Sequence, residues 1–284
     1  MLHELALDKQ NLHGYFSVDL EPVLEIESGD SVRISLPNAG WDLTAGEKLE
    51  PRNPELDTGH PLAGPIAVRG AQAGQTLAVR IDEVEVGEWG VTWVPDDHLV
   101  HWQLEGGVGR ALGFERTLGP FLGVMGMPPP EAGVHPTFPP RRWGGNIDCK
   151  ELVAGTTLFL PIPVDRALFS AGDGHAAQGD GEVSGTAIEA PVRARLQLEV
   201  RDDLLLEWPI ARVDGAWLTF GFDEHLGLAA KIATDGMIAL MGRELGVGEQ
   251  DALALASVGV DLRVTQVVNG VAGVHAVLGD NVFR

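Results

Sequence analysis

The sequence contains a single cysteine, Cys149, among its 284 residues, so no disulfide can form within the chain. One free thiol is compatible with a reducing compartment. The N-terminus lacks the basic segment followed by an apolar stretch that marks a secretory signal. No stretch approaches the roughly 20 uninterrupted apolar residues that a membrane helix needs. We therefore expect a cytoplasmic protein.

Positive charge is also scarce. The chain has 20 Lys and Arg residues against 41 Asp and Glu, which gives a formal net charge of −21. Such a chain would repel the phosphates of nucleic acids and anionic membrane surfaces, so neither is expected as a partner. Small neutral or cationic molecules fit better as ligands, although strong acidity also occurs in proteins from salt-rich habitats.

Short runs of alternating apolar and polar residues are typical of strands with one buried face. We interpret 21–36 as a β-hairpin that turns at 28–31, and the C-terminal run as a second hairpin that turns at Asn269-Gly270. Asp223 is a plausible N-cap for a helix that Gly246 ends, and 251–257 reads as a second short helix. The predicted fold is mainly β, a single sandwich or jelly-roll-like domain over 1–284 with a helical hairpin at about 223–257.

Residues 119–142 are dense in proline, so no regular element is expected there. A long ordered loop within a compact domain is usually functional. His135 and Arg141 in this loop are candidates for orienting a ligand, and an ion pair is an equally good explanation of the arginine. His101, which lies among tryptophans 89, 93 and 102, is a third candidate.

The stretch from Asp173 to Glu182 has the highest density of chemically useful groups. Glycines at 172, 174, 179 and 181 disfavour a helix, and they allow the chain to bend so that side chains converge. Upstream, Asn146 and Asp148 are two residues apart, which in a strand places both on one face. Carboxylates and an imidazole brought together in this way are typical of a metal site with a general base beside it. A polar surface turn is the alternative.

Three motifs, GGNIDCKEL, GTTLFLPIPV and ALFSAGDGHAAQGDGEVSGTAIEAP, together resemble the central signature of the acetamidase/formamidase family. Further similarity includes PFLGVMG, the HPTFPPRR segment and the C-terminal ASVGVDLRVTQVVNGVAGVHAVL, and His60 lies in another matching segment. The resemblance runs from about residue 21 to 284. It implies a mainly β fold, a divalent metal and hydrolysis of a short-chain amide to a carboxylate and ammonia.

Within this resemblance, spacing suggests which residues act. We expect Asp148, Asp173 and His175 to ligate the metal, with Asn146 or Asp180 completing the shell. Zn²⁺ is the expected ion, and Ca²⁺ is a further candidate. Glu182 is the expected base for a metal-activated water, with His175 as its catalytic partner. The candidates for binding the amide are His101, His135, Gln178 and Arg141.

Other chemistries stay open at this point. Cys149 beside Lys150 invites a thiol nucleophile, but a free cysteine is usually a buried core residue. Ser170 and Ser184 are isolated, and the Ser-Ser-Lys pattern of the amidase-signature enzymes is missing from the sequence. A γ-lactam hydrolase of the same family and a non-catalytic metal-binding or ligand-binding sandwich are the alternative functions. We also expect a homodimer or larger assembly, with 128–140 as a contact.

Overall fold

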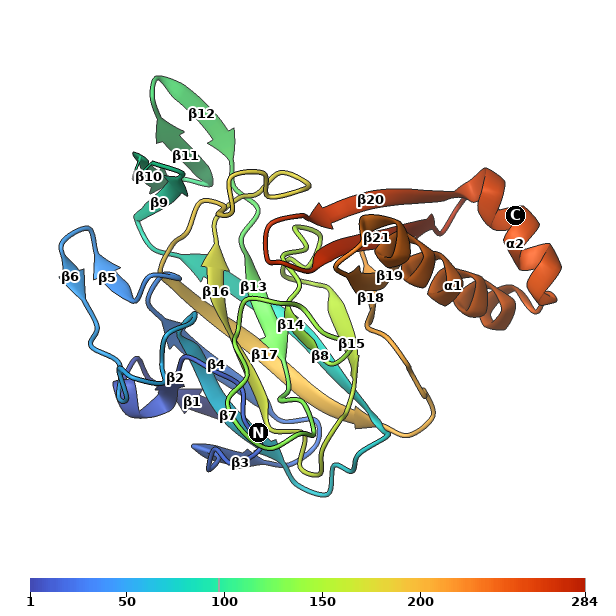
Figure 1. Ribbon diagram of the computed structural model, residues 1–284, viewed down its shortest axis with the longest axis horizontal. Helices are drawn as coiled ribbons and strands as arrows, with labels where there is room; N and C mark the ends of the chain where they lie inside the picture. The colour runs from blue at the N-terminus through green and yellow to red at the C-terminus, as the bar shows by residue number, and fades with distance from the viewer. Residues whose placement is uncertain (97, 284) are drawn as a thin grey trace.

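The computed structural model describes residues 1–96 and 98–283, and strands dominate it (Figure 1). The helices are a 3-10 turn, η1 (Lys9–Asn11), and two α-helices, α1 (Leu226–Leu245) and α2 (Glu249–Gly259). The strands are β1 (Leu2–Leu5), β2 (Leu12–His13), β3 (Leu24–Ile26), β4 (Ser31–Leu36), β5 (Asp42–Thr44), β6 (Glu47–Lys48), β7 (Leu62–Val68), β8 (Thr76–Val86), β9 (Trp89–Val94), β10 (His98–Glu105), β11 (Val108–Ala111), β12 (Phe114–Thr117), β13 (Phe121–Gly126), β14 (Gly144–Asn146), β15 (Thr157–Pro161), β16 (Phe169–His175), β17 (Val192–Arg201), β18 (Ile210–Val213), β19 (Ala216–Asp223), β20 (Val260–Gln266) and β21 (Ala272–Gly279).

Two large sheets form the body of the molecule. One has the order β1-β4-β17-β8-β15-β18-β19-β21-β20, and the other has the order β14-β13-β16-β7-β2, with β3 added beside β7. A continuous cluster of buried apolar side chains joins them, including Ile34 and Val79 of the first sheet and Ile66 and Phe169 of the second. The mainly β sandwich expected from the sequence is therefore the observed fold.

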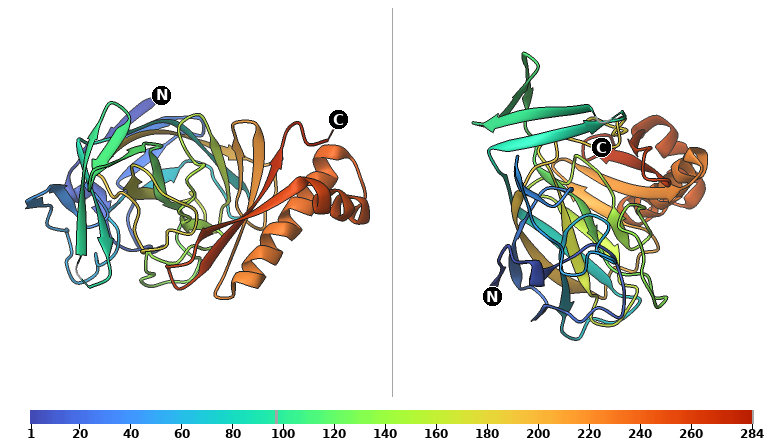
Figure 2. Two further views of the ribbon diagram at one scale, coloured as in Figure 1. Left: turned by 90° about the horizontal axis from the view of Figure 1, so that it is seen from above. Right: turned by 60° about the vertical axis from the view of Figure 1, so that its left-hand side comes forward.

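A smaller sheet, β12-β11-β10-β9, projects from the upper left of the sandwich, and β18–β21 with the two α-helices project to the right (Figures 1 and 2). Helix α1 packs on β19 through a close approach at Gly221. A Cβ there would lie 2.0 Å from the Ala229 carbonyl oxygen, so the contact requires glycine. Within the described residues, neither α-helix combines the length and hydropathy needed to cross a membrane.

The predicted helical hairpin is present, but its first cap differs from the prediction. The residue before α1 is His225, and Asp223 accepts a hydrogen bond from the His225 backbone N–H at 2.8 Å. Gly246 ends the helix in the left-handed conformation, with φ of 67°, as the sequence predicts. The C-terminal hairpin is also confirmed, because β20 and β21 are antiparallel neighbours on either side of Asn269-Gly270.

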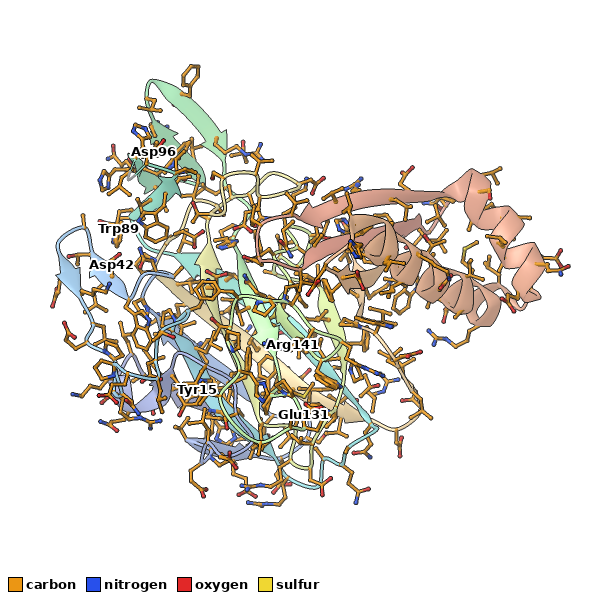
Figure 3. The ribbon with its side chains drawn as sticks, viewed as in Figure 1. Tyr15, Asp42, Trp89, Asp96, Glu131 and Arg141 are labelled. Atoms are coloured by element: carbon orange, nitrogen blue, oxygen red, sulfur yellow. The ribbon has the colours of Figure 1, made fainter. Side chains whose placement is uncertain are left out.

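Two other predictions about local structure were wrong. Strands β3 and β4 both exist, but β3 pairs in parallel with β7, whereas β4 pairs with β1 and β17 in the other sheet. They therefore form a connection between the sheets and no hairpin. The 119–142 region contains β13 between Pro120 and the run of prolines that starts at Pro128, and the irregular loop begins only after Gly126. Glu131 and Arg141 mark this loop on the front of the sandwich in Figure 3.

Candidate functional site

The candidate site is built on β16, which carries Asp173 and His175 on one face, and on the turn after β14, which carries Asp148. Neighbouring β13 contributes Gly123. A Cβ at Gly123 would lie 2.3 Å from Asp173 Oδ2 and 2.5 Å from Asp148 Oδ1. The two carboxylates can therefore face each other only because position 123 has no side chain.

His175 lies at the centre of a buried acidic cluster. Its Nε2 is 3.3 Å from Asp173 Oδ2 and 3.3 Å from Glu189 Oε2. Potential ligand atoms form two overlapping groups, Asp148–His175–Glu182 and Asp173–His175–Glu189, and within each group these atoms lie within 4.8 Å of one another. The side chains of both groups are buried, so bulk water does not solvate this charge.

Backbone conformation also marks the site. Asp148, Asp173 and Glu182 have φ values of 52°, 63° and 47°, in the left-handed region that residues other than glycine rarely adopt. Conformations of this kind cost free energy and persist where the surrounding structure requires them. Here they allow three carboxylates from different segments to point toward one imidazole.

Side-chain amides hold the cluster in place. Gln178 Nε2 donates to the Asp148 carbonyl oxygen at 2.7 Å, which leaves Gln178 Oε1 facing His175 Nδ1 at 3.0 Å. Since Oε1 can only accept, Nδ1 carries a proton and Nε2 faces the carboxylates. Asn269, in the turn between β20 and β21, donates to Asp148 Oδ2 at 2.8 Å.

The crowding shifts the pKa values of these groups in opposite directions. Burial raises the pKa of Asp148 well above its usual value, and the charges of Glu182 and Asp173 raise it further. Burial likewise raises the pKa of Glu182 to about 7, although His175 opposes this shift. Burial lowers the pKa of His175, but Glu189 and Asp173 outweigh it and hold that pKa well above its usual range. Burial would raise the pKa of Asp173, but the neighbouring imidazolium of His175 reverses this effect and the pKa is lowered.

Several buried oxygen atoms of this cluster lack a hydrogen-bond partner in the described part of the chain. They are Asn146 Oδ1, Asp148 Oδ1, Glu182 Oε2 and Glu189 Oε2. Buried polar atoms without partners are costly, and buried charges are normally paired or bound to metal. Oxygen ligands beside one imidazole nitrogen are the donor set of a divalent cation, so the residues present fit such an ion.

A cavity of about 350 Å³ opens above the cluster. The polar part of its lining includes Asn146, Asp173, His175, Glu182 and Glu189. Aromatic side chains, Trp41, Trp93 and Phe138, line other parts, together with His60. The His60 ring lies 4.7 Å from that of Phe138, and His60 Nδ1 is 2.9 Å from the Thr137 hydroxyl. This is a small chamber with an acidic surface and an aromatic wall.

The structure brings together Asn146, Asp148, Asp173, His175 and Glu182 from the residues that the sequence suggested, and it places Asp180 outside the cluster. Asp180 Oδ1 instead accepts from Lys150 Nζ at 2.8 Å, and its side chain is 36% exposed. The ion pair with Lys150 holds the Asp180 side chain there, and Gly181 next to it turns the chain with a φ of 93°.

Three of the four candidates for binding the amide lie elsewhere. His101 is exposed on β10, and His135 Nε2 donates to the Glu131 carbonyl oxygen at 2.9 Å. Arg141 donates to the carbonyl oxygens of Pro139 and Pro136 at 3.0 and 2.9 Å, so it stabilises the proline-rich loop. Gln178 orients His175, as described above.

Sequence reasoning missed two residues of the site. Glu189 stands alone in the apolar run GTAIEAP, and an isolated acid in such a run is the signal that could have identified it. Asn269 was interpreted only as a turn residue, and no sequence signal links it to Asp148. His60 was noted, and the structure places it in the wall of the cavity.

Known proteins match both the sequence and the fold. A putative formamidase of Schizosaccharomyces pombe is 26% identical over 257 residues, covering 64% of this chain and 62% of that protein, which is less than two thirds of its length. Acetamidase from Bacillus halodurans has a TM-score of 0.88 at 27% identity, with 97% of each chain covered. A predicted acetamidase/formamidase from Thermoanaerobacter tengcongensis has a TM-score of 0.89 at 25% identity, covering 99% of this chain and 96% of that one. The family model described as "Acetamidase/Formamidase family" matches residues 2–107 and 131–215, more than half of the sequence, so this chain belongs to the acetamidase/formamidase family.

Proposed function

We propose that this protein hydrolyses the C–N bond of small linear amides, of the formamide and acetamide type, to a carboxylate and ammonia. The observation that carries the proposal is the buried cluster around His175, with its unpartnered oxygen atoms, at the base of a small cavity. Family membership supports the reaction class.

We infer that a divalent cation is held by His175 Nε2 together with oxygens of Asp148, Asp173 and Glu189, with Asn146 Oδ1 available to complete the shell. Glu189 thus takes the place that the sequence suggested for Asp180. A bound cation of this kind supplies a more acidic water and polarises the amide carbonyl. The imidazole nitrogen favours Zn²⁺, and Ca²⁺ would use the oxygen ligands alone.

Glu182 is the residue we assign to proton transfer. Its Oε2 has no hydrogen-bond partner in the described part of the chain, and burial raises its pKa to about 7. A carboxylate with a pKa near neutrality can accept a proton from the attacking water and return it to the departing nitrogen. The new C–O bond and the broken C–N bond then leave a carboxylate and ammonia.

His60 and the aromatic wall form the part of the cavity available to the substrate. The imidazole of His60 can donate a hydrogen bond to an amide oxygen, and Phe138 packs against the His60 ring. Trp41 and Trp93 limit the space for the acyl group. A short acyl chain therefore fits this chamber better than a peptide.

Ammonia release from formamide, acetamide and propionamide, together with ring opening of a γ-lactam, tests the proposal. Each assay uses the protein as purified, after chelation, and after Zn²⁺ or Ca²⁺ is returned. Loss of linear-amide hydrolysis on chelation and its recovery with one ion are the expected results. Turnover that chelation leaves intact in protein shown to be metal-free would contradict the metal assignment.

The same assays separate the alternative functions. Faster opening of the γ-lactam than of any linear amide would reassign the substrate within the same chemistry. Tight metal binding without turnover of any amide would instead indicate a non-catalytic binding protein. Homo-oligomer formation, a cytoplasmic location and the single-domain organisation over 1–284 stay predictions.

A further inference from the structure

A second cluster of potential metal ligands lies behind the turn that carries Asp148. Cys149 Sγ donates to Glu151 Oε2 at 3.2 Å, and His275 Nε2 lies 3.7 Å from the same oxygen. The three potential ligand atoms lie within 4.8 Å of one another. The cluster thus joins the turn after β14 to the middle of β21.

The imidazole of His275 is the unusual feature of this cluster. His275 is fully buried, and its Nε2 has no hydrogen-bond partner in the described part of the chain. Its other nitrogen, Nδ1, is fixed by the Thr265 hydroxyl at 2.8 Å. A histidine held at one nitrogen with the other directed at a carboxylate and a thiol has the arrangement of a metal ligand with its outer-shell partner.

We propose that Cys149, Glu151 and His275 form a second cation site, selective for a thiophilic divalent ion such as Zn²⁺ or Cd²⁺. Zinc with Cys, His and carboxylate ligands has bond lengths of about 2.0–2.3 Å and tetrahedral geometry, so neighbouring ligand atoms lie roughly 3.2–3.7 Å apart. The separations of Glu151 Oε2 from Cys149 Sγ and His275 Nε2 match that range. Three protein ligands leave the fourth position to water.

Charge and access both suit this ion. Ion binding displaces the thiol proton to solvent, so a thiolate and the Glu151 carboxylate balance the two positive charges. Arg263 Nη1 contacts the other oxygen of Glu151 at 2.9 Å, which leaves Oε2 for the ion. The Glu151 side chain is 17% exposed and borders a surface cavity with Arg212 and Asp280, which gives the ion a route inward.

The site differs from the proposed catalytic centre in having a sulfur ligand. A thiolate raises the affinity for Zn²⁺, Cd²⁺ and Co²⁺ relative to Ca²⁺ and Mg²⁺. Occupancy would tie the β20–β21 hairpin to the turn that carries Asp148, and it would stabilise the folded state by mass action. The role we assign is therefore structural.

Titration of Co²⁺ into the full-length, chelator-treated protein tests this inference, with thiolate-to-cobalt charge-transfer absorption as the readout. Cys149 is the single cysteine of the sequence, so any such band reports this residue. We expect a band that saturates within the two equivalents that the two proposed sites can bind, is lost in Cys149→Ser and persists in Glu182→Gln. Cd²⁺ should displace Co²⁺, and excess Ca²⁺ should not.

The other ligands are tested by Glu151→Gln and His275→Gln. Loss of an outer-shell partner typically lowers metal affinity by roughly 10–100-fold. Because each of these substitutions removes a ligand itself, each should lower Co²⁺ affinity by at least this much. Arg263→Gln is the matched control, because it removes a contact to the same carboxylate without removing a ligand, and its band should remain. If His275→Gln does not fold, the Co²⁺ affinity of Glu151→Gln alone tests the ligand assignment. No band, or a band unchanged in Glu151→Gln, would overturn the proposal.

Discussion

Gln178 fixes the orientation of His175, with Gln178 Oε1 3.0 Å from His175 Nδ1. The other end of the same carboxamide donates to the backbone carbonyl of Asp148. One side chain therefore sets the position of a candidate metal ligand and of the turn that carries another.

Replacing Gln178 by alanine should weaken metal binding about 10–100-fold, because His175 loses the partner that directs Nε2 toward the ion. Isothermal titration calorimetry with Zn²⁺ measures the change. Gln197→Ala is the matched control, since Gln197 Nε2 donates to the Gly29 carbonyl oxygen at 2.9 Å, in a part of the fold away from the site. Equal affinities of the two variants would contradict a positioning role for Gln178.

Glu182→Gln should lower amide turnover by about 10²–10⁴-fold, which is the usual contribution of a positioned general acid–base group. Steady-state ammonia release measures the effect. Asp180→Asn is the matched control on the same loop, and it should retain turnover because Asp180 contacts Lys150. A comparable loss in both variants would return Asp180 to the site.

The metal-free Glu182→Gln protein should also be more stable than the metal-free wild type. The substitution removes one acidic group from a buried cluster in which the carboxylates repel one another. Chemical denaturation with chelator present should therefore give a higher midpoint for the variant. A lower midpoint would mean that the Glu182 carboxylate stabilises the metal-free fold.

Gly123→Ala should abolish the site by steric overlap. The new Cβ would lie 2.3 Å from Asp173 Oδ2, so the carboxylates must move apart. Overpacking of this kind typically costs about 1–3 kcal/mol of stability, and metal affinity should fall with it. Gly119→Ala, which places its Cβ in open space, is the control. A crystal structure or metal titration of G123A that matches the wild type would contradict the predicted overlap.

His13 should make stability depend on pH. It is fully buried, Nδ1 donates to the Tyr15 carbonyl oxygen at 2.6 Å, and Nε2 accepts from the Ser170 hydroxyl at 2.9 Å. Burial lowers its pKa from 6.5 to about 4. Between these values the unfolded chain binds a proton that the folded protein does not, so stability present above pH 6.5 is lost as the pH falls toward 4.

The size of this effect is at most about 3.5 kcal/mol, since each pKa unit corresponds to about 1.4 kcal/mol. Denaturation of the wild type and of His13→Gln across pH 4 to 7 measures it as a difference in slope. The variant should show a flatter profile. Parallel profiles would mean that His13 does not titrate separately in the two states.

Local sequence patterns determined much of this protein. Apolar alternation predicted the β class, Gly246 predicted the end of α1, and Asn269-Gly270 predicted the β20–β21 turn, because each depends on the conformational preferences of a few adjacent residues. The spacing of Asp173 and His175 likewise follows from strand geometry, in which alternate residues share a face.

Tertiary structure alone decided which of these groups meet. Strand β3 pairs with β7 rather than with β4, and Asn269 reaches Asp148 across 121 residues of sequence. Glu189 joins His175 and Asp180 turns away from it, although Asp180 is nearer in the chain. Sequence spacing fixes the face on which a side chain emerges. Which faces become neighbours depends on strand order and on the close packing allowed at Gly123, and these exist only in the folded protein.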